Sequence, residues 1–403
     1  MWRMWFAVWW LSGIAVWALE AELRLSPGPA GVDIAQVSSD LMLLPAAEKV
    51  LPGQLVYVYV ALQGEAPPAG TARWEGRLQR LAADGAAAVL PAAEFRAAAG
   101  GGMLQPAPDC RSLQLLGVYT VPAGSTPGTV ITLQATVREV TPEGVDEEPA
   151  EVWTSRPAAL TVEALPPVSR QPEGAAAPDN RFAMSFYYLM PEPGALISLY
   201  FDFLRTFPTA GAPDDRKIVV LSWFYQAFKL NPQLWPALVD AVLEESGQTA
   251  RDVTTALLLQ LEAPPEILAP LGDFARFYGD RWEAGYFETA QVIAPMQLDF
   301  LWTEFTVTGR CRPIEKIAGA LALMEDGMSP EAFAALEQPT PEDRRKLVRY
   351  LIASAAEWSL GRQAAQHELV RRYCGRLAAD ETVPEPVRKK LRRILATVET
   401  PKE

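Results

Sequence analysis

The apolar periodicity of this chain changes once, across a segment rich in proline, glycine and alanine. That segment, LPPVSRQPEGAAAPDNR at 165–181, has no periodicity of its own. Before it, apolar and polar residues alternate as in strands; after it, apolar residues recur every three or four positions, as in helices. The sequence therefore predicts a β domain at 21–165, a linker at 166–181 and an α-helical domain at 182–403, each domain with a core of its own.

Short alternating segments separated by glycine and proline fill the β domain. In the clearest one, LVYVYVAL at 55–62, the valines share one face and the tyrosines the other. The pair Asp84-Gly85 favours the tight turn of a hairpin. Segments of this kind, without a long helical pattern, predict an immunoglobulin-like antiparallel β-sandwich. The alanine-rich stretch 86–102 is expected to be an insertion loop.

Polar residues followed by proline predict helix starts in the second domain. Three such pairs are Asn231-Pro232, Ser329-Pro330 and Thr340-Pro341. After the last pair, one helix face is expected to be buried, and it carries Leu347, Leu351, Ala355 and Trp358. The predicted connections are short, so neighbouring helices should pair antiparallel in an all-α, α/α helical array. A fixed 34-residue repeat is not evident, which argues against a tetratricopeptide array.

The N-terminus has the pattern of a secretory signal peptide at 1–20. Arg3 precedes an uncharged apolar run, and Val16 and Ala18 occupy the −3 and −1 positions of a cleavage site. As a helix the run is about 24 Å long at ~1.5 Å per residue, which is short against a hydrocarbon core of about 30 Å. Cleavage is therefore favoured, with the protein in the periplasm or outside the cell. The alternative is an inner-membrane anchor, in which case this segment would be the membrane contact.

The net charge is −13 and unevenly distributed. The C-terminal residues 339–403 contain 14 Lys and Arg against 9 Asp and Glu, so the excess of acid lies before them. Nucleic acid is a poor candidate ligand for an acidic exported protein, because affinity for phosphate comes from clustered cations. A protein partner in the cell envelope is the expected interaction.

Three cysteines, Cys110, Cys311 and Cys374, are too few for a disulfide scaffold. Export permits one disulfide, and we predict it between Cys311 and Cys374, which both lie in the helical domain. The alternative is that both are small buried residues in separate places. A single histidine excludes metal sites built on several histidines, and no metal or cofactor is expected.

His367 is that single histidine, and it has two possible roles. A catalytic triad would use His367 with a nearby serine, Ser354 or Ser359, and with Glu357, but the chain has no G-x-S-x-G motif. The favoured interpretation is a packing residue at a helix boundary, after a helix that ends at Leu360-Gly361. We therefore expect no catalytic residue here.

Two segments of the helical domain resemble an uncharacterised family of bacterial helical proteins. They are LDFLWTEFTVTGRCRPIEKI and AAEWSLGRQAAQHELV, with the patterns LW-x-x-F-x-x-TG and W-S-L followed by Q-H. The matching residues are Trp302, Phe305, Gly309, Pro313, Trp358, Ser359, Leu360, Gln366 and His367. The resemblance covers a little over half of the chain. It implies a helical domain and no particular activity.

The favoured function is that of an exported, non-catalytic binding or assembly protein, an adaptor or scaffold of the bacterial envelope. Candidate binding residues are Phe186, Tyr187 and Tyr188 in the aromatic segment that opens the helical domain. They either dock the two domains together or form an exposed patch for a partner. Docking is favoured, because the segment adjoins the linker.

The alternative function is a carbohydrate-active hydrolase with paired carboxylates in the helical domain. Its candidate carboxylates and tryptophan platforms are Asp214, Asp215, Glu244, Glu245, Asp273, Trp223, Trp235 and Trp282. Two observations argue against it. The helical domain has about 220 residues, too few for a barrel of twelve helices with ordinary loops. The tryptophans also fall on apolar stripes, where core packing is the usual role.

Overall fold

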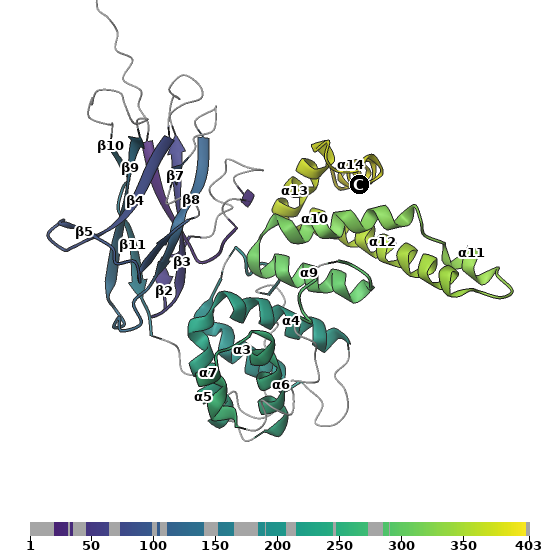
Figure 1. The fold of residues 1–403 in the computed structure, drawn as a ribbon, viewed down its shortest axis with the longest axis horizontal. Coiled ribbons are helices and arrows are strands. Elements are labelled where there is room, and N and C mark those ends of the chain that lie inside the picture. The colour runs from purple at the N-terminus through teal and green to yellow at the C-terminus, as the bar shows by residue number, and fades with distance from the viewer. Residues whose placement is uncertain are drawn as a thin grey trace, which may run out of the picture.

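The computed structural model of the 403-residue chain describes residues 20–30, 33–34, 46–63, 73–98, 103–104, 111–140, 152–164, 184–189, 191–206, 215–244, 247–272, 285–289 and 291–399. Within them, the N-terminal half forms β-sheets and the C-terminal half is helical (Figure 1). This order of β and α halves was predicted. The predicted linker, and the predicted signal peptide up to residue 19, lie outside the described residues.

Two sheets form the N-terminal half. The first is antiparallel with the order β1-β3-β8-β6, and its strands are β1 (Glu20–Ser26), β3 (Leu55–Gln63), β8 (Arg111–Thr120) and β6 (Phe95–Ala97). The second has the order β2-β11-β9-β4-β5, with β10 beside β9 and β7 beside β4. Its strands are β2 (Lys49–Val50), β4 (Arg73–Leu81), β5 (Ala87–Val89), β7 (Met103–Leu104), β9 (Val130–Val140), β10 (Val152–Thr154) and β11 (Ala158–Val162). The expected insertion loop at 86–102 is therefore wrong, because it contributes β5 and β6.

Strand β3 is buried on both faces. Its valines lie between the two sheets, in a core that includes Leu133 and Leu160 of the second sheet. On the opposite face, Tyr59 and Ala61 pack in a cluster with residues of the helical half. The predicted alternation of β3 is confirmed, and its tyrosine face is the one that meets the helices.

The helical half contains helices of very different length. They are α3 (Leu196–Leu204), α4 (Asp215–Leu230), α5 (Trp235–Glu244), α6 (Gln248–Gln260), α7 (Pro265–Leu268), α9 (Pro295–Thr308), α10 (Cys311–Ala320), α11 (Pro330–Ala334), α12 (Pro341–Gln366), α13 (Glu368–Ala379) and α14 (Glu385–Glu399). Two predicted caps are confirmed, because the side chains of Ser329 and Thr340 accept backbone N–H groups at the starts of α11 and α12. Asn231 instead precedes a 3-10 turn, Pro232–Leu234, and makes no cap.

The helices form two groups that meet through α4 and α9. Helices α3 to α6 surround an aromatic core that includes Tyr200, Phe224 and Phe228. Helices α9, α10 and α12 to α14 surround a second core. Between the groups, the hydroxyls of Ser222 and Thr303 lie 2.8 Å apart.

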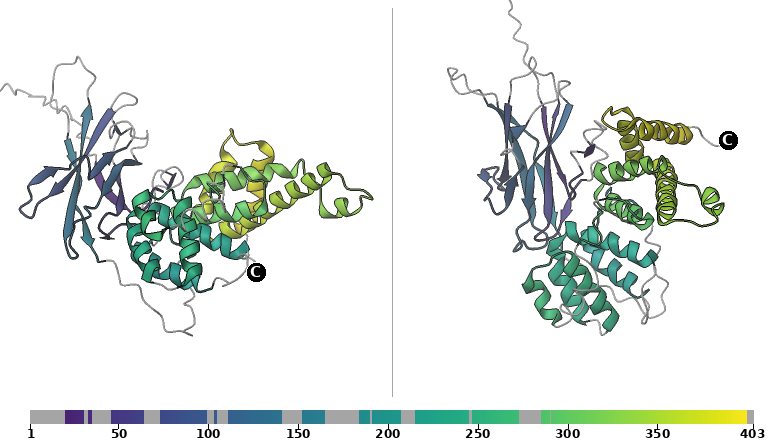
Figure 2. Two further views of the ribbon diagram at one scale, coloured as in Figure 1. Left: turned by 60° about the horizontal axis from the view of Figure 1, so that its bottom comes forward. Right: turned by 45° about the vertical axis from the view of Figure 1, so that its right-hand side comes forward.

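The helical half has no core separate from the β half. The cluster around α9 to α14 also contains Ala30, Ile34, Tyr59, Ala61 and Leu113. The cluster around α3 to α6 contains Leu51. Helices α9 to α14 lie beside the sheets, and the group with α3, α5, α6 and α7 lies at one end of them (Figures 1 and 2). The β half keeps a core of its own between its sheets, so the prediction of separate cores is confirmed for that half. It is wrong for the helical half, because the helices cover the outer face of β3 and their cores take in residues of the β half.

Candidate functional site

The aromatic segment that opens the helical half is a docking element. Tyr187 and Tyr188 are 5% and 4% exposed, and Phe186 is half-buried. The ring of Tyr188 lies 5.1 Å from that of Phe305 on α9, in the cluster that also holds Ala30. The two tyrosines are thus covered, and they do not form the exposed patch that was the other possibility.

His367 lies at the junction of α12 and α13 and is 2% exposed. Its ring stacks on Phe186 at 4.4 Å, and its Nδ1 lies 3.2 Å from the Tyr188 hydroxyl. Burial lowers the pKa of His367 to about 4, so the ring is neutral at pH 7. Burial also raises the pKa of Tyr188, so at pH 7 the hydrogen bond joins a protonated hydroxyl and a neutral imidazole.

The boundary position predicted for His367 is confirmed, but the predicted end of the preceding helix at Leu360-Gly361 is wrong. Helix α12 continues through Gly361 to Gln366. The triad candidates on α12 have other partners: the Ser359 hydroxyl donates to a backbone carbonyl at 3.1 Å, and Glu357 pairs with Arg393. These contacts are structural, and they do not connect the two side chains to the imidazole.

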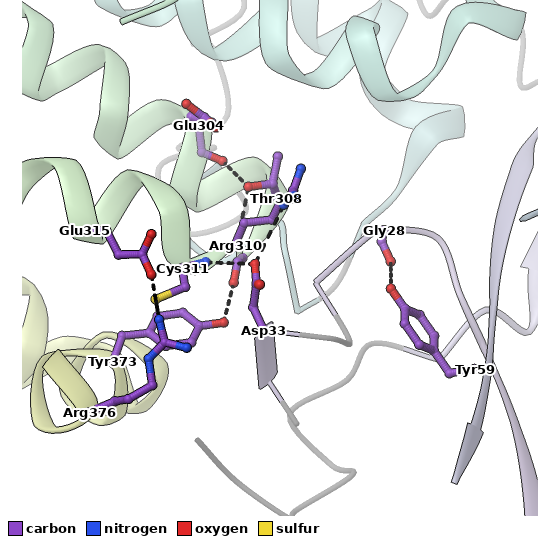
Figure 3. A network of polar contacts seen from close by, with 11 residues as sticks. Gly28, Asp33, Tyr59, Glu304, Thr308, Arg310, Cys311, Glu315, Tyr373 and Arg376 are labelled. Atoms are coloured by element: carbon purple, nitrogen blue, oxygen red, sulfur yellow. Dashed lines mark hydrogen bonds and ion pairs between the residues drawn. The ribbon is translucent and has the colours of Figure 1, made fainter. Parts of the chain in front are cut away.

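A carboxylate from the β half caps a helix of the helical half (Figure 3). Asp33 Oδ2 accepts the backbone N–H of Cys311 at 3.0 Å, at the first residue of α10. The Arg310 guanidinium lies 3.7 Å from the same oxygen. A negative charge at a helix N-terminus is favourable, because the first N–H groups there have no partner within the helix. Asp33 therefore acts as a remote N-cap that connects the two halves.

Beside this cap, α13 contacts α10 and the end of α9 through a second set of polar contacts (Figure 3). Arg376 donates to the Cys311 Sγ at 3.2 Å and to the Glu315 carboxylate at 2.5 Å. The hydroxyl of Tyr373 donates to the backbone carbonyl of Gly309 at 3.0 Å. These contacts hold α13 against the start of α10, where Asp33 arrives from the other side.

The predicted disulfide between Cys311 and Cys374 is absent from the structure, because both thiols are free and buried. Burial raises the pKa of Cys311, and it raises that of Cys374 to about 12. The reason is geometric: Arg376 contacts Cys311, and residues two apart on a helix, such as Cys374 and Arg376, point in different directions. Cys110 lies outside the described residues.

Two of the three tryptophans proposed as sugar platforms, Trp223 and Trp235, have structural roles. Trp223 is 2% exposed, and its indole N–H donates to a backbone carbonyl at 3.1 Å. The indole of Trp235 does the same at 3.0 Å. Of the candidate carboxylates, Asp215 begins α4 and Glu244 ends α5, both at exposed positions. The other candidates, Asp214, Glu245, Asp273 and Trp282, lie outside the described residues.

A groove lies between the β2–β11 edge and the turn at Pro193–Ala195. Lys49 and Glu163 line it and pair with each other at 2.8 Å. Gln54 also lines it, and its side chain accepts the N–H of Leu51 at 2.8 Å. These polar groups are therefore already engaged by neighbours.

The outer face of α12 is the largest departure from expectation. We define it by the residues that follow one line on the helix, Arg344, Val348, Leu351, Ala355, Trp358 and Arg362. Leu351 is 42% exposed and Trp358 is 65% exposed, so the prediction that these two are buried is wrong. Leu347 and Ala355 of the same predicted face are half-buried, and Ala355 packs against the core of α9 to α14. The helix packs instead through a second stripe, made of Ile352, Ala353, Ala356, Leu360 and Ala364. Small side chains in that stripe allow neighbouring helices to approach closely.

The charged groups near this face are arranged unevenly. Arg362 lies over the Trp358 ring, 5.4 Å from its centroid. Glu357, on the packed side of the helix, is engaged by Arg393 and Lys390 of α14. The face is therefore apolar at its centre and basic at its ends.

The described residues place no three His, Cys, Asp or Glu side chains where they could hold a metal ion. In the same part of the chain, none of the helices combines the length and apolar character that crossing a membrane requires.

No family model and no curated protein matches this sequence. Among solved structures, the chain is similar to the native conformation of Escherichia coli alpha-2-macroglobulin, with 10% identity and a TM-score of 0.21. The match covers 94% of this chain and 25% of that chain, so this chain spans about a quarter of its length. A likeness at this TM-score does not assign the fold or the function.

Proposed function

We propose that this chain is an exported, non-catalytic binding or assembly protein of the bacterial cell envelope, an adaptor or scaffold. The observation that carries the proposal is the outer face of α12. Trp358 is 65% exposed, and Leu351 and Val348 are 42% and 40% exposed on the same line. Contiguous exposed apolar residues mark interaction sites, and tryptophan and arginine are enriched among residues that dominate binding energy.

The support beneath this face is rigid. Helix α12 has 26 residues and begins with a capping box formed by Thr340 and Asp343. Its opposite stripe is buried, and it contacts α9, α10, α13 and α14. A face held in this way needs little ordering when a partner binds, which favours affinity.

The finer fold that accompanies this proposal is an immunoglobulin-like sandwich followed by an α/α helical array. Two sheets that share one core support the first part. Contacts of α12 with α13, and of α13 with α14, support the second. Both architectures recur in proteins that bind partners, and this support is by analogy of fold.

Export is supported by the signal-like N-terminus and by the position of β1. Cleavage after Ala18 would leave β1 whole, because the strand begins at Glu20. Cleavage after Ala21 would remove Glu20 and Ala21, which pair with Gln63 and Leu62. We expect the mature chain to begin at Leu19, and intact-mass measurement of exported protein tests this. A full-length mass in the membrane fraction would contradict cleavage.

The binding role is tested by site-specific photo-crosslinking in the cells that make the protein. A photoreactive amino acid replaces Leu351 on the outer face of α12. In the control it replaces Val89 of β5, which is 81% exposed in the β half. We expect discrete adducts, identified by mass spectrometry, from position 351 and not from position 89. Absence of an adduct at 351, or the same adducts at both positions, would contradict a binding role for this face.

A further inference from the structure

We infer that the outer face of α12 binds an acidic amphipathic helix of a protein partner. This inference rests on the proposed function, because it takes that face to be a binding surface, and it adds the chemistry of the partner. The alternatives are a second copy of this chain and an anionic membrane. The positions and partners of the charges on α12 distinguish these occupants.

The face has an arginine at each end of an apolar centre. Arg344 and Arg362 are five turns of about 3.6 residues apart, so they lie on one line about 27 Å from each other. The apolar residues between them are Val348, Leu351, Ala355 and Trp358. Successive members are three or four residues apart, so they share one face of the kind by which a helix packs against another. A complementary helix therefore has an apolar stripe with a carboxylate at each end.

The two arginines are available for such carboxylates. Within the described part of the chain, neither Arg344 nor Arg362 forms an ion pair. The acidic residues of α12 are engaged elsewhere: Glu342 by Arg345 and Arg349, Asp343 by Thr340, and Glu357 by Arg393 and Lys390. The outer face of α12 therefore keeps a positive charge at each end of its apolar centre.

A second copy of the same face is a poor partner. If two outer faces paired antiparallel about a two-fold axis, Arg344 of one copy would meet Arg362 of the other. If they paired parallel, each arginine would meet its own equivalent. Both arrangements oppose like charges, which is unfavourable in a contact that excludes water.

An anionic membrane is also a poor partner. A helix that lies in a membrane interface keeps its cations on the side opposite its apolar stripe. Here the side opposite the apolar stripe is packed against other helices, as the burial of Ala356 and Leu360 shows. The arginines lie in line with Leu351 and Trp358, so insertion of these residues would carry the guanidinium groups toward the lipid. Carboxylates of a protein helix can pair with arginines in that position.

The test uses the full mature chain and two synthetic helical peptides of about 20 residues, labelled with fluorescein. Both carry the same leucine stripe; one has glutamate at both ends of the stripe and the other has lysine. Fluorescence anisotropy measures binding. We expect the glutamate peptide to bind at least tenfold tighter, as loss of two interfacial ion pairs implies, and to weaken as salt is raised.

Variants of the face locate the binding. Trp358→Ala should reduce affinity for the glutamate peptide about tenfold or more, the range of an interfacial hot spot. The double variant Arg344→Glu/Arg362→Glu should reverse the preference, so that the lysine peptide binds tighter. The control Ile293→Ser removes an apolar side chain that is 66% exposed outside this face, and it should leave binding unchanged. All three changes are at exposed positions, and circular dichroism melting verifies that each variant is folded.

Several outcomes would overturn the inference. Equal binding of the two peptides, or binding unaffected by Trp358→Ala, would reject an acidic partner on this face. If the protein sediments together with phosphatidylglycerol vesicles, and Trp358→Ala abolishes this, the face would be assigned to a membrane. If sedimentation velocity shows a dimer, and the same change dissociates it, the face would be assigned to a second copy of this chain. The cellular adduct at position 351 can be a protein even if the glutamate and lysine peptides bind with equal affinity. In that case the binding role stands, and only the inference of an acidic partner fails.

Discussion

The hydroxyl of Tyr188 lies 3.2 Å from Nδ1 of His367, although the two residues are 179 positions apart in the chain. This contact brings the start of the helical half to the junction of α12 and α13. Among the residues that the structure describes, His367 has no charged partner, and burial lowers its pKa to about 4. Burial in this contact therefore favours the neutral imidazole.

This contact predicts a dependence of stability on pH. The pKa of His367 is about 4 when folded and 6.5 as a free side chain. Because folding favours the neutral ring, its contribution is fully present above pH 6.5 and is lost as pH falls from 6.5 to about 4. The linkage relation gives a loss of about 2 kcal/mol between pH 7 and pH 5. Urea unfolding at several pH values measures it.

The matched variant is His367→Gln, which cannot titrate. At pH 7 it should cost about 1–2 kcal/mol, the range of a lost buried hydrogen bond. Its stability should fall less than that of the wild type between pH 7 and pH 5. Equal slopes for the two proteins would mean that other groups cause the pH dependence.

Asp33 provides a second prediction. Its carboxylate accepts the N–H of Cys311 at 3.0 Å and so caps α10 from the β half. Asp33→Ala should cost about 1–2 kcal/mol, as loss of an N-cap does. Asp33→Asn keeps an acceptor but removes the charge, so it should cost less, with a smaller dependence on salt. Chemical unfolding at low and high salt measures both.

The control for Asp33 is Asp326→Ala, which removes the same charge from an exposed position. It should change the free energy of unfolding by less than about 0.5 kcal/mol. If the Asp33 and Asp326 variants are equally stable, Asp33 does not act as a cap.

The sequence was sufficient to predict the order of the β and α halves, because side chains on one face recur every two residues in a strand and every three or four residues in a helix. It also predicted that His367 stands at a helix boundary. It did not predict which of the two stripes of α12 is buried. Leu351 and Trp358 look like core residues, whereas the buried stripe contains Ala353 and Ala356. Only the positions of the neighbouring helices decide between the two.

The docking of the two halves was also only partly predictable. The segment with Tyr187 and Tyr188 was expected to dock because it adjoins the linker. Nothing in the sequence near Asp33 indicates that its carboxylate caps a helix that begins at Cys311. A contact of this kind joins residues 278 positions apart, and local patterns do not encode it. For the same reason, the expected export to an oxidising compartment could not show whether Cys311 and Cys374 pair.

Replacement by alanine should have opposite effects on the stability of the protein at two glycines. Gly361 lies inside α12, and an added Cβ would meet nothing nearer than Ile394 Cγ2 at 3.9 Å. Gly361→Ala should therefore stabilise the protein by about 0.5–1 kcal/mol through helix propensity. Gly309 ends α9 with φ of +65°, and a Cβ there would lie 3.0 Å from Tyr188 Cδ2. Gly309→Ala should destabilise by about 1 kcal/mol or more. Thermal melts of the two variants would contradict this if both shifts had the same sign.

The last prediction concerns the two thiols of the helical half. Cys311 and Cys374 are free, and they are 2% and 0% exposed. Burial raises both pKa values, so neither thiol forms the thiolate that reacts with alkylating agents. At pH 8 the folded protein should leave both unmodified by iodoacetamide. In urea without reductant, both should be labelled, as peptide mapping would show.

An engineered cysteine at an exposed turn, Ala123→Cys, controls for the activity of the reagent and should be labelled in the folded state. A crosslinked peptide containing Cys311 and Cys374, unlabelled in urea until reductant is added, would contradict the structure. It would require the side chain of Cys374 to reach the sulfur that Arg376 now contacts at 3.2 Å. Helix α13 would then have to rotate, which would pull Tyr373 away from the Gly309 carbonyl. Labelling of both thiols in urea without reductant would therefore also support the packing of α13 against α10.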